Sequence, residues 1–165
     1  MFMKKMVTKA TSAALVLTFA LGASASAHEL TPEQNAVMKA ANEVKVTASG
    51  TSTKGISSTS GGAWQLKVTR GSFLAWSDAI VNWESNGKKI TKSEASQASG
   101  WVFPNIVKEK GITKQNVMSS DTSHVYLSKT SIGAGIVTPW GDVEIYETDF
   151  SDYIRVNHDG SYDNW

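Results

Sequence analysis

Residues 123–158 read SHVYLSKTSIGAGIVTPWGDVEIYETDFSDYIRVNH, and this stretch decides the fold. It contains candidate strands in which β-branched and aromatic residues are frequent. Turn-forming residues separate these strands at Ser131–Gly135, Pro139-Trp140-Gly141 and Asp149–Asp152. Short strands with frequent turns predict an antiparallel β structure. The candidate strands are residues 123–129, 133–139, 142–148 and 153–158.

The same pattern extends back to Trp64. WQLKVT (64–69) alternates between apolar and polar residues, and Asn86-Gly87 predicts a two-residue hairpin turn. We expect a short helical turn at Ser93–Ser99, and a strand in WVFPNIV (101–107) that Pro104 interrupts. These elements predict a mainly β domain over residues 63–165, either a small antiparallel β-sandwich or an open barrel.

One short helix is predicted before the β domain, within residues 28–46. Thr31 is suited to the N-cap, Pro32 to the first helical position, and Gln34 to completing a capping box. Apolar residues then recur at helical spacing, and the helix is expected to end near Lys45. These apolar residues are Val37, Met38, Ala41 and Val44.

Residues 47–62, TASGTSTKGISSTSGG, have two interpretations that the sequence leaves open. Four glycines and nine Ser or Thr residues favour a mobile linker, because they bury little apolar area. The Val and Thr residues of EVKVTASGTSTKG (43–55) equally favour strands at a sheet edge. In a linker, Lys54 and Gly55 are the expected site of extracellular proteolysis.

The first 27 residues have the pattern of a secretory signal peptide. Lys4, Lys5 and Lys9 precede an apolar run that ends in Ala25-Ser26-Ala27. The run is too short for a comfortable membrane span of about 20 residues. We expect cleavage after Ala27, which would make His28 the first mature residue, and export of a protein that is not integral to a membrane.

Composition excludes several classes of site. The chain has no cysteine, so it forms no disulfide and no thiolate metal site. It carries no G-x-S-x-G motif and no phosphate-binding loop, and its charge pattern does not indicate nucleic-acid binding. Residues 141–165 hold seven acidic residues against Arg155 alone, so we expect them to attract the basic remainder of the chain. No catalytic residue and no cofactor is predicted.

Aromatic and basic residues are the candidate binding groups. The chain has six tryptophans, of which Trp140 lies in a predicted turn and Trp165 at the C-terminal end. These two are expected to be the most exposed, and exposed Trp residues serve contacts with sugars, proteins or membranes. The basic candidates for contact with a bacterial envelope are Lys88, Lys89, Lys108 and Lys110.

Two patterns favour metal binding weakly. A free His28 amine and imidazole, with His124 and Tyr126, would match a copper-binding histidine brace, but such histidines are more often structural. Asn157, Asp159, Ser161 and Asp163 place oxygen ligands at alternate positions, as in extracellular calcium loops. An acidic turn is the simpler explanation, and no metal is predicted.

Two short stretches carry a resemblance to a known family. Gly61-Gly62-Ala63-Trp64 and Tyr162-Asp163-Asn164-Trp165 resemble the corresponding parts of lactococcin-like bacteriocins, which are exported and rich in β structure. The resemblance implies a secreted, non-enzymatic antibacterial protein, and it transfers no site residues. A cut within residues 47–62 would separate the helical region and activate the β domain. The alternatives are a module that binds cell-wall or other polysaccharide, and an inhibitor of a secreted protease.

Overall fold

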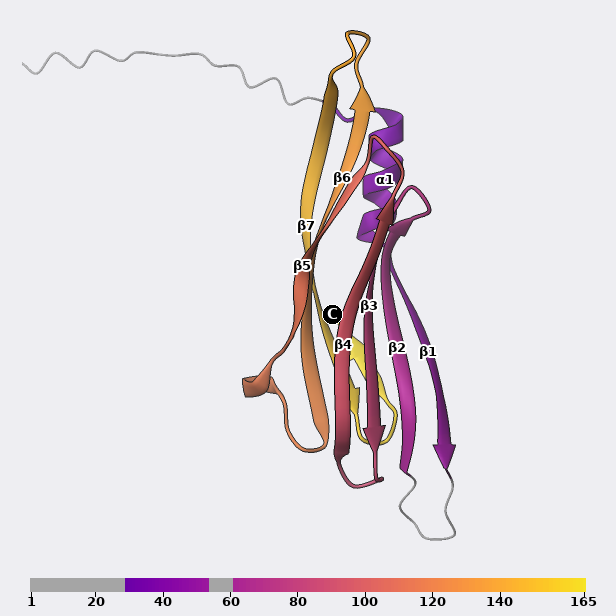
Figure 1. Cartoon of the computed structure of the whole chain (residues 1–165), viewed down its shortest axis with the longest axis vertical. Helices are drawn as coiled ribbons and strands as arrows, with labels where there is room; N and C mark the ends of the chain where they lie inside the picture. Colours follow the sequence, from indigo (N-terminus) through magenta and orange to yellow (C-terminus); the bar gives the residue numbers. More distant parts are fainter. Residues whose placement is uncertain (1–28, 54–60) are drawn as a thin grey trace, which may run out of the picture.

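The computed structural model describes residues 29–53 and 61–165, which form two antiparallel sheets and one α-helix (Figure 1). Sheet A contains β1–β4 and sheet B contains β5–β8, each in chain order. The mainly β fold and the short N-terminal helix are confirmed, and the sheets are open rather than closed into a barrel. The elements are α1 (Pro32–Asn42), β1 (Val44–Thr53), β2 (Gly61–Ser72), β3 (Ala75–Ser85), β4 (Ile90–Trp101), β5 (Ile106–Lys114), the 3₁₀ turn η1 (Asn116–Met118), β6 (Ser123–Val137), β7 (Val143–Asn157) and β8 (Tyr162–Asn164).

The main core lies between the two sheets. In β3, the alternate residues Ala79, Val81 and Trp83 are buried, as expected for a strand with one face turned toward the interior. Leu66 of β2 pairs with Val81 and is fully buried. Sheet B contributes the facing residues Tyr126, Ile154 and Val156.

The predicted start of the helix is confirmed in detail. The Thr31 hydroxyl accepts from the Gln34 backbone N–H at 3.3 Å, and the Gln34 side chain accepts from the Thr31 N–H at 3.1 Å. Gln34 also donates to the carbonyl of Ala134 at 3.2 Å, which ties the helix to β6. The helix closes one end of the sandwich, where a second core forms from Val37, Met38, Ala41, Ala75, Val107, Ile132, Ala134 and Phe150.

The helix ends earlier than the sequence analysis predicted. The described part of the segment that follows it forms a strand and not a linker. The helix ends at Asn42, and Val44 begins β1 instead of lying on the helix. β1 forms ten residue pairs with β2, and Gly61 and Gly62 belong to β2. The edge-strand interpretation of residues 47–53 is therefore correct, because their backbone groups pair with those of β2 in an antiparallel ladder. Lys54 and Gly55 lie outside the described residues.

The helical turn predicted at Ser93–Ser99 is wrong, because these residues form the middle of β4. The stretch contains Ala, Glu and Gln, which favour helices when no other contact decides. Here β4 pairs with β3 along its whole length, and Ala95 packs against the main core. Tertiary contacts thus override local propensity.

Two predicted turns in the sheet B region are also wrong. Ser131–Gly135 lies inside β6, and Asp149–Asp152 lies inside β7, so each of these strands runs for 15 residues. Gly135 is required by a close approach, since a Cβ there would lie 2.2 Å from the Pro104 carbonyl oxygen. Pro104 does not interrupt a strand, because it lies in the connection between β4 and β5.

The turn predicted at Asn86-Gly87 is confirmed in position but is longer than predicted. Asn86 begins the β3–β4 connection, and its side-chain oxygen accepts from the backbone N–H groups of Lys88 and Lys89. Gly87 has a φ of 84°, which favours glycine. The connection spans residues 86–89, longer than the two residues expected, since Ser85 pairs with Ile90.

Candidate functional site

Large apolar side chains are exposed on three neighbouring connections of the sandwich, next to α1. We call this surface the apolar end. Trp140 is 89% exposed, Phe73 81% and Phe103 71%, whereas aromatic rings of this size are normally mostly buried. The β2–β3 turn, the β4–β5 connection and the β6–β7 hairpin supply its residues, which are Phe73, Trp101, Val102, Phe103, Val137, Trp140 and Val143.

A backbone hydrogen bond joins two of these connections, and a mainly apolar hollow lies beside them. The Val102 N–H donates to the Leu74 carbonyl at 2.8 Å, which joins the β4–β5 connection to the β2–β3 turn. A mainly apolar hollow of about 520 Å³ lies beside them, between α1 and the end of β6. Its apolar lining comes from Val37, Leu74, Phe103, Pro104, Ile136 and Val137.

Trp140 does not line this hollow but lies in the β6–β7 hairpin, which projects at the top of Figure 1. The hairpin is closed by a hydrogen bond from the Thr138 N–H to the Asp142 carbonyl at 2.8 Å. Gly141, with a φ of 89°, supplies the left-handed residue that the turn needs. Trp140 is therefore held outward by a defined turn, as the sequence predicted.

The second predicted aromatic, Trp165, does not belong to the apolar end. Its ring stacks on Tyr153 at a centroid distance of 5.7 Å, and Arg155 lies 4.9 Å from its centroid. It remains 50% exposed. Trp101 is slightly more exposed, at 53%, and the sequence analysis did not single it out.

The four predicted lysines do not form one surface with Trp140. Lys88 and Lys89 are exposed on the β3–β4 connection, at the end of the sandwich opposite the β6–β7 hairpin (Figure 1). Lys108 and Lys110 lie on the outer face of sheet B, where both are paired with acidic residues. The structure therefore separates the predicted basic groups from the predicted aromatic contact.

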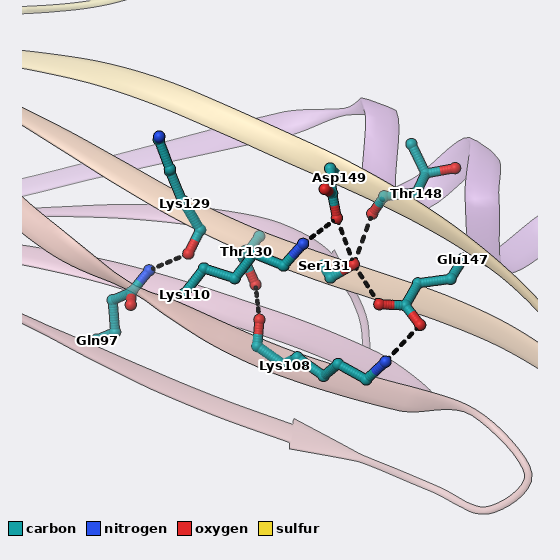
Figure 2. A network of polar contacts seen from close by, with 9 residues as sticks. All are labelled: Gln97, Lys108, Lys110, Lys129, Thr130, Ser131, Glu147, Thr148 and Asp149. Carbon is teal, nitrogen blue, oxygen red and sulfur yellow. Dashed lines mark hydrogen bonds and ion pairs between the residues drawn. The ribbon is translucent and has the colours of Figure 1, made fainter.

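The pairing of Lys108 and Lys110 involves a polar network centred on Ser131 (Figure 2). The Lys108 ammonium lies 2.6 Å from Glu147, and that of Lys110 lies 2.5 Å from Asp149. The buried Ser131 hydroxyl lies 2.5 Å from Glu147 and 2.6 Å from Asp149. Hydrogen bonds from the lysines and from Ser131 lower the pKa of both carboxyl groups.

This network links the acidic C-terminal region to the rest of the chain. A hydroxyl has one proton, so Ser131 donates to one carboxylate at a time, and the two lysines balance the two negative charges. Ser131 is fully buried and therefore inaccessible as a nucleophile. The expected attraction between the basic body and residues 141–165 is confirmed by these pairs and by the ion pair of Arg70 with Asp152.

His124 and Tyr126 meet on the inner face of sheet B, through Ser93 of β4. The Ser93 oxygen lies 2.6 Å from His124 Nδ1 and 2.5 Å from the Tyr126 hydroxyl. Burial is the main cause that lowers the pKa of His124 and raises that of Tyr126. The Ser93 hydroxyl therefore links the His124 imidazole to the Tyr126 hydroxyl through two hydrogen bonds.

Neither proposed metal pattern is assembled in the described residues. His28 lies outside them, and no group of three or more His, Asp or Glu residues within 29–53 and 61–165 could hold a metal ion. In the 157–163 turn, Asp159 accepts from the backbone and the hydroxyl of Ser161 at 3.0 and 2.7 Å. These hydrogen bonds account for the acidic turn without a ligand, and they lower the pKa of Asp159.

Comparisons of this chain with protein-family models, curated proteins and solved structures find no match. Among the described helices, none is long and apolar enough to cross a membrane, since α1 has 11 residues. The apolar end is therefore the strongest candidate site on structural grounds alone. The sequence analysis missed the other six residues of this surface, although Phe73, Trp101 and Phe103 lie directly beside Ser72, Gly100 and Pro104.

Proposed function

We propose that this protein is exported and acts as an antibacterial protein at the envelope of competing bacteria, which it contacts through the apolar end. One observation carries the proposal: seven large apolar side chains from three separate connections are exposed together. A large exposed apolar patch marks a surface that meets a membrane or an apolar partner. The secretory pattern of residues 1–27 supports export.

The composition of the apolar end is suited to a membrane surface. Tryptophan and phenylalanine rings favour the interface between lipid headgroups and acyl chains, and valine side chains favour the acyl region. Trp140 would enter first, because it lies at the tip of the projecting hairpin. Phe103 and the hollow beside it would then meet the same surface.

Removal of the N-terminal helix is not needed for this contact. The apolar end is exposed with α1 in place, and α1 buries Val37, Met38 and Ala41 in the second core. We therefore expect full activity from the uncut mature chain, without cleavage at Lys54 or Gly55.

The test is inhibition of growth of a panel of bacteria by purified residues 28–165. Trp140→Ser and Phe103→Ser should each reduce inhibition at least tenfold, and leakage of dye from vesicles of the target's lipids should fall in parallel. Val117→Ser is the matched control, because Val117 is fully exposed on η1, away from the apolar end. Circular dichroism would verify that each variant keeps its β structure.

Three results would overturn the proposal. One is the absence of growth inhibition by the mature chain at micromolar concentration. Another is unchanged inhibition by the Trp140→Ser, Phe103→Ser double variant. The third is a loss of inhibition in Val117→Ser as large as that in Trp140→Ser or Phe103→Ser, which would show that the effect is not specific to the apolar end.

A further inference from the structure

The outer face of sheet A is a second exposed surface, and it is polar. The face turns away from sheet B, and alternate residues of β1–β4 project from it. Strands of 10 to 12 residues make this face about 35 to 40 Å long, which is enough for several sugar units in a row. Its polar side chains include Thr47, Ser49, Gln65, Lys67, Thr69, Asp78, Asn82, Glu84, Lys92 and Glu94.

Trp76 is the one tryptophan on this face. Its neighbours across the sheet are Gly71 on β2 and Gly100 on β4. A Cβ at Gly100 would lie 2.9 Å from three atoms of the indole, so the ring lies directly over that glycine. The two glycines leave room for a half-buried indole against the sheet, and such a ring can stack against a sugar.

Polar groups surround the indole. A hollow of about 480 Å³ lies beside Trp76 and is also lined by Lys45, Lys67, Thr69 and Asp78. The Asp78 carboxylate accepts from the Thr69 hydroxyl at 2.5 Å and lies 3.4 Å from the Lys67 ammonium. These contacts fix the carboxylate at the edge of the hollow, where its remaining lone pairs can accept from sugar hydroxyls.

A second hollow of about 520 Å³ lies further along the same face. Gln65, Asn82 and Glu84 line it together with Lys92 and Glu94. The Gln65 amide donates to the Asn82 amide oxygen at 2.9 Å, which orders both amides across the two central strands. Amides and carboxylates are the groups that bind sugar hydroxyls, because they supply donors and acceptors close together.

The charges of this face favour an uncharged ligand. Three lysines and three acidic residues project from it, so the face has no net charge: Lys45, Lys67 and Lys92 against Asp78, Glu84 and Glu94. Polyanions such as nucleic acids or phosphate-containing polymers are attracted by clustered positive charge, which this face lacks.

From these observations we propose that the outer face of sheet A binds an uncharged polysaccharide strand, with Trp76 stacked against one sugar ring and Asp78 accepting hydrogen bonds from its hydroxyls. The two hollows would hold two segments of the same strand. This surface adjoins the apolar end at Phe73, which also lines the hollow beside Trp76, but sugar binding by Trp76 and Asp78 does not depend on antibacterial action.

The test is binding of purified residues 28–165 to two uncharged probes, hydroxyethylcellulose in affinity electrophoresis and an N-acetylglucosamine hexamer in calorimetry. We expect binding to at least one probe, at least a tenfold loss of affinity in Trp76→Ala, and partial retention in Trp76→Phe. Trp101→Ala is the matched control, since Trp101 is 53% exposed at the apolar end, and it should bind like the natural chain. Asp78→Asn should weaken binding less than Trp76→Ala.

The proposal would be overturned by no binding to either probe at millimolar sugar concentration, or by unchanged binding in a folded Trp76→Ala variant. Binding only to an anionic polymer such as polyglycerol phosphate, abolished by 0.5 M salt, would also overturn it. Because growth inhibition is measured separately with Trp140→Ser, failure of one proposal does not imply failure of the other.

Discussion

Arg70 and Asp152 lie 82 residues apart and form a two-bond ion pair that joins the two sheets. The guanidinium Nε and Nη2 each lie 2.6 Å from a different oxygen of the Asp152 carboxylate. Arg70 also donates to the Ala41 carbonyl at the end of α1 and lies 4.9 Å from the centre of the Phe150 ring. One side chain thus connects sheet A, sheet B and the helix.

Loss of one partner of this pair should destabilise the fold strongly. Asp152→Asn leaves the Arg70 charge in a site where its side chain is only 14% exposed, and we expect a loss of about 3 to 5 kcal/mol. Asp163→Asn is the matched control, because its pair with Arg155 is longer, at 3.8 Å, and more exposed, so less than about 1 kcal/mol should be lost. Urea unfolding measures the free energy that each variant loses. Equal losses would show that the Arg70 ion pair contributes no more to stability than an exposed pair.

The chain should remain assembled after a cut between β1 and β2. If residues 54–60 are replaced by a specific protease recognition sequence and cut, ten strand pairs and the buried face of α1 still hold residues 29–53. We expect the two fragments to co-elute in size-exclusion chromatography without denaturant and to separate in urea. Spontaneous release of the N-terminal fragment would instead support a removable pro-region.

Gly135 should not tolerate a side chain. Its Cβ would lie 2.2 Å from the Pro104 carbonyl oxygen, which is backbone and cannot turn aside. Gly135→Ala should therefore lower the free energy of unfolding by about 1 to 3 kcal/mol and disturb the β4–β5 connection, including Phe103. Gly111→Ala is the comparison, since it meets no atom within 4 Å and carries only the strain of a φ of 97°. A smaller loss at Gly135 than at Gly111 would contradict this account.

The sequence was sufficient for the parts of the fold that depend on local chemistry. The capping box at Thr31, the turn at Gly87 and the turn around Trp140 each follow from a few neighbouring residues, and all are present. The strand at Ser93–Ser99 could not be predicted in this way, because its pairing partners in β3 are 10 to 22 residues away in sequence. Its residues form a strand because β3 is beside them.

The same limit applies to the candidate site. Trp140 could be recognised from its turn, but its relation to Phe73 and Phe103 depends on how three distant connections meet at one end of the sandwich. Likewise, the sequence alone indicates that Lys108 and Lys110 are unpaired basic groups. In the structure, β7 brings Glu147 and Asp149 beside them. The numbers of charged residues predicted that residues 141–165 and the rest of the chain attract each other. The strand register, which the sequence does not show, decides which residues form the pairs.

The Ser131 network should stabilise the fold at neutral pH and not in acid. The pKa values of Glu147 and Asp149 are lowered, so their stabilising effect is complete above their unfolded values, about 4.3 and 3.9, and is lost as pH falls through the lower folded values. Ser131→Ala removes one donor, so both pKa values should rise, as NMR titration would show. Unchanged pKa values in Ser131→Ala would mean that the lysines alone stabilise the carboxylates.

His124 should give the fold a second acid-sensitive contact, in a higher pH range. Burial, with Lys114 nearby, lowers its pKa, and Asp121 opposes this shift. The folded protein therefore binds a proton at His124 less readily than the unfolded chain, whose histidine has a pKa of about 6.5. Stability should be complete above pH 6.5 and should fall as the pH drops from there toward the lower folded value.

The measurement is urea unfolding between pH 8 and pH 5 in a His158→Asn background, which removes the other histidine of the described residues. There, His124→Asn should flatten the pH dependence, because an Asn amide can still form a hydrogen bond with Ser93 as donor or acceptor but does not titrate in this range. A pH dependence that is unchanged by His124→Asn would show that protonation of His124 is not the cause. An imidazole that titrates above 6.5 by NMR would contradict the direction of the shift itself.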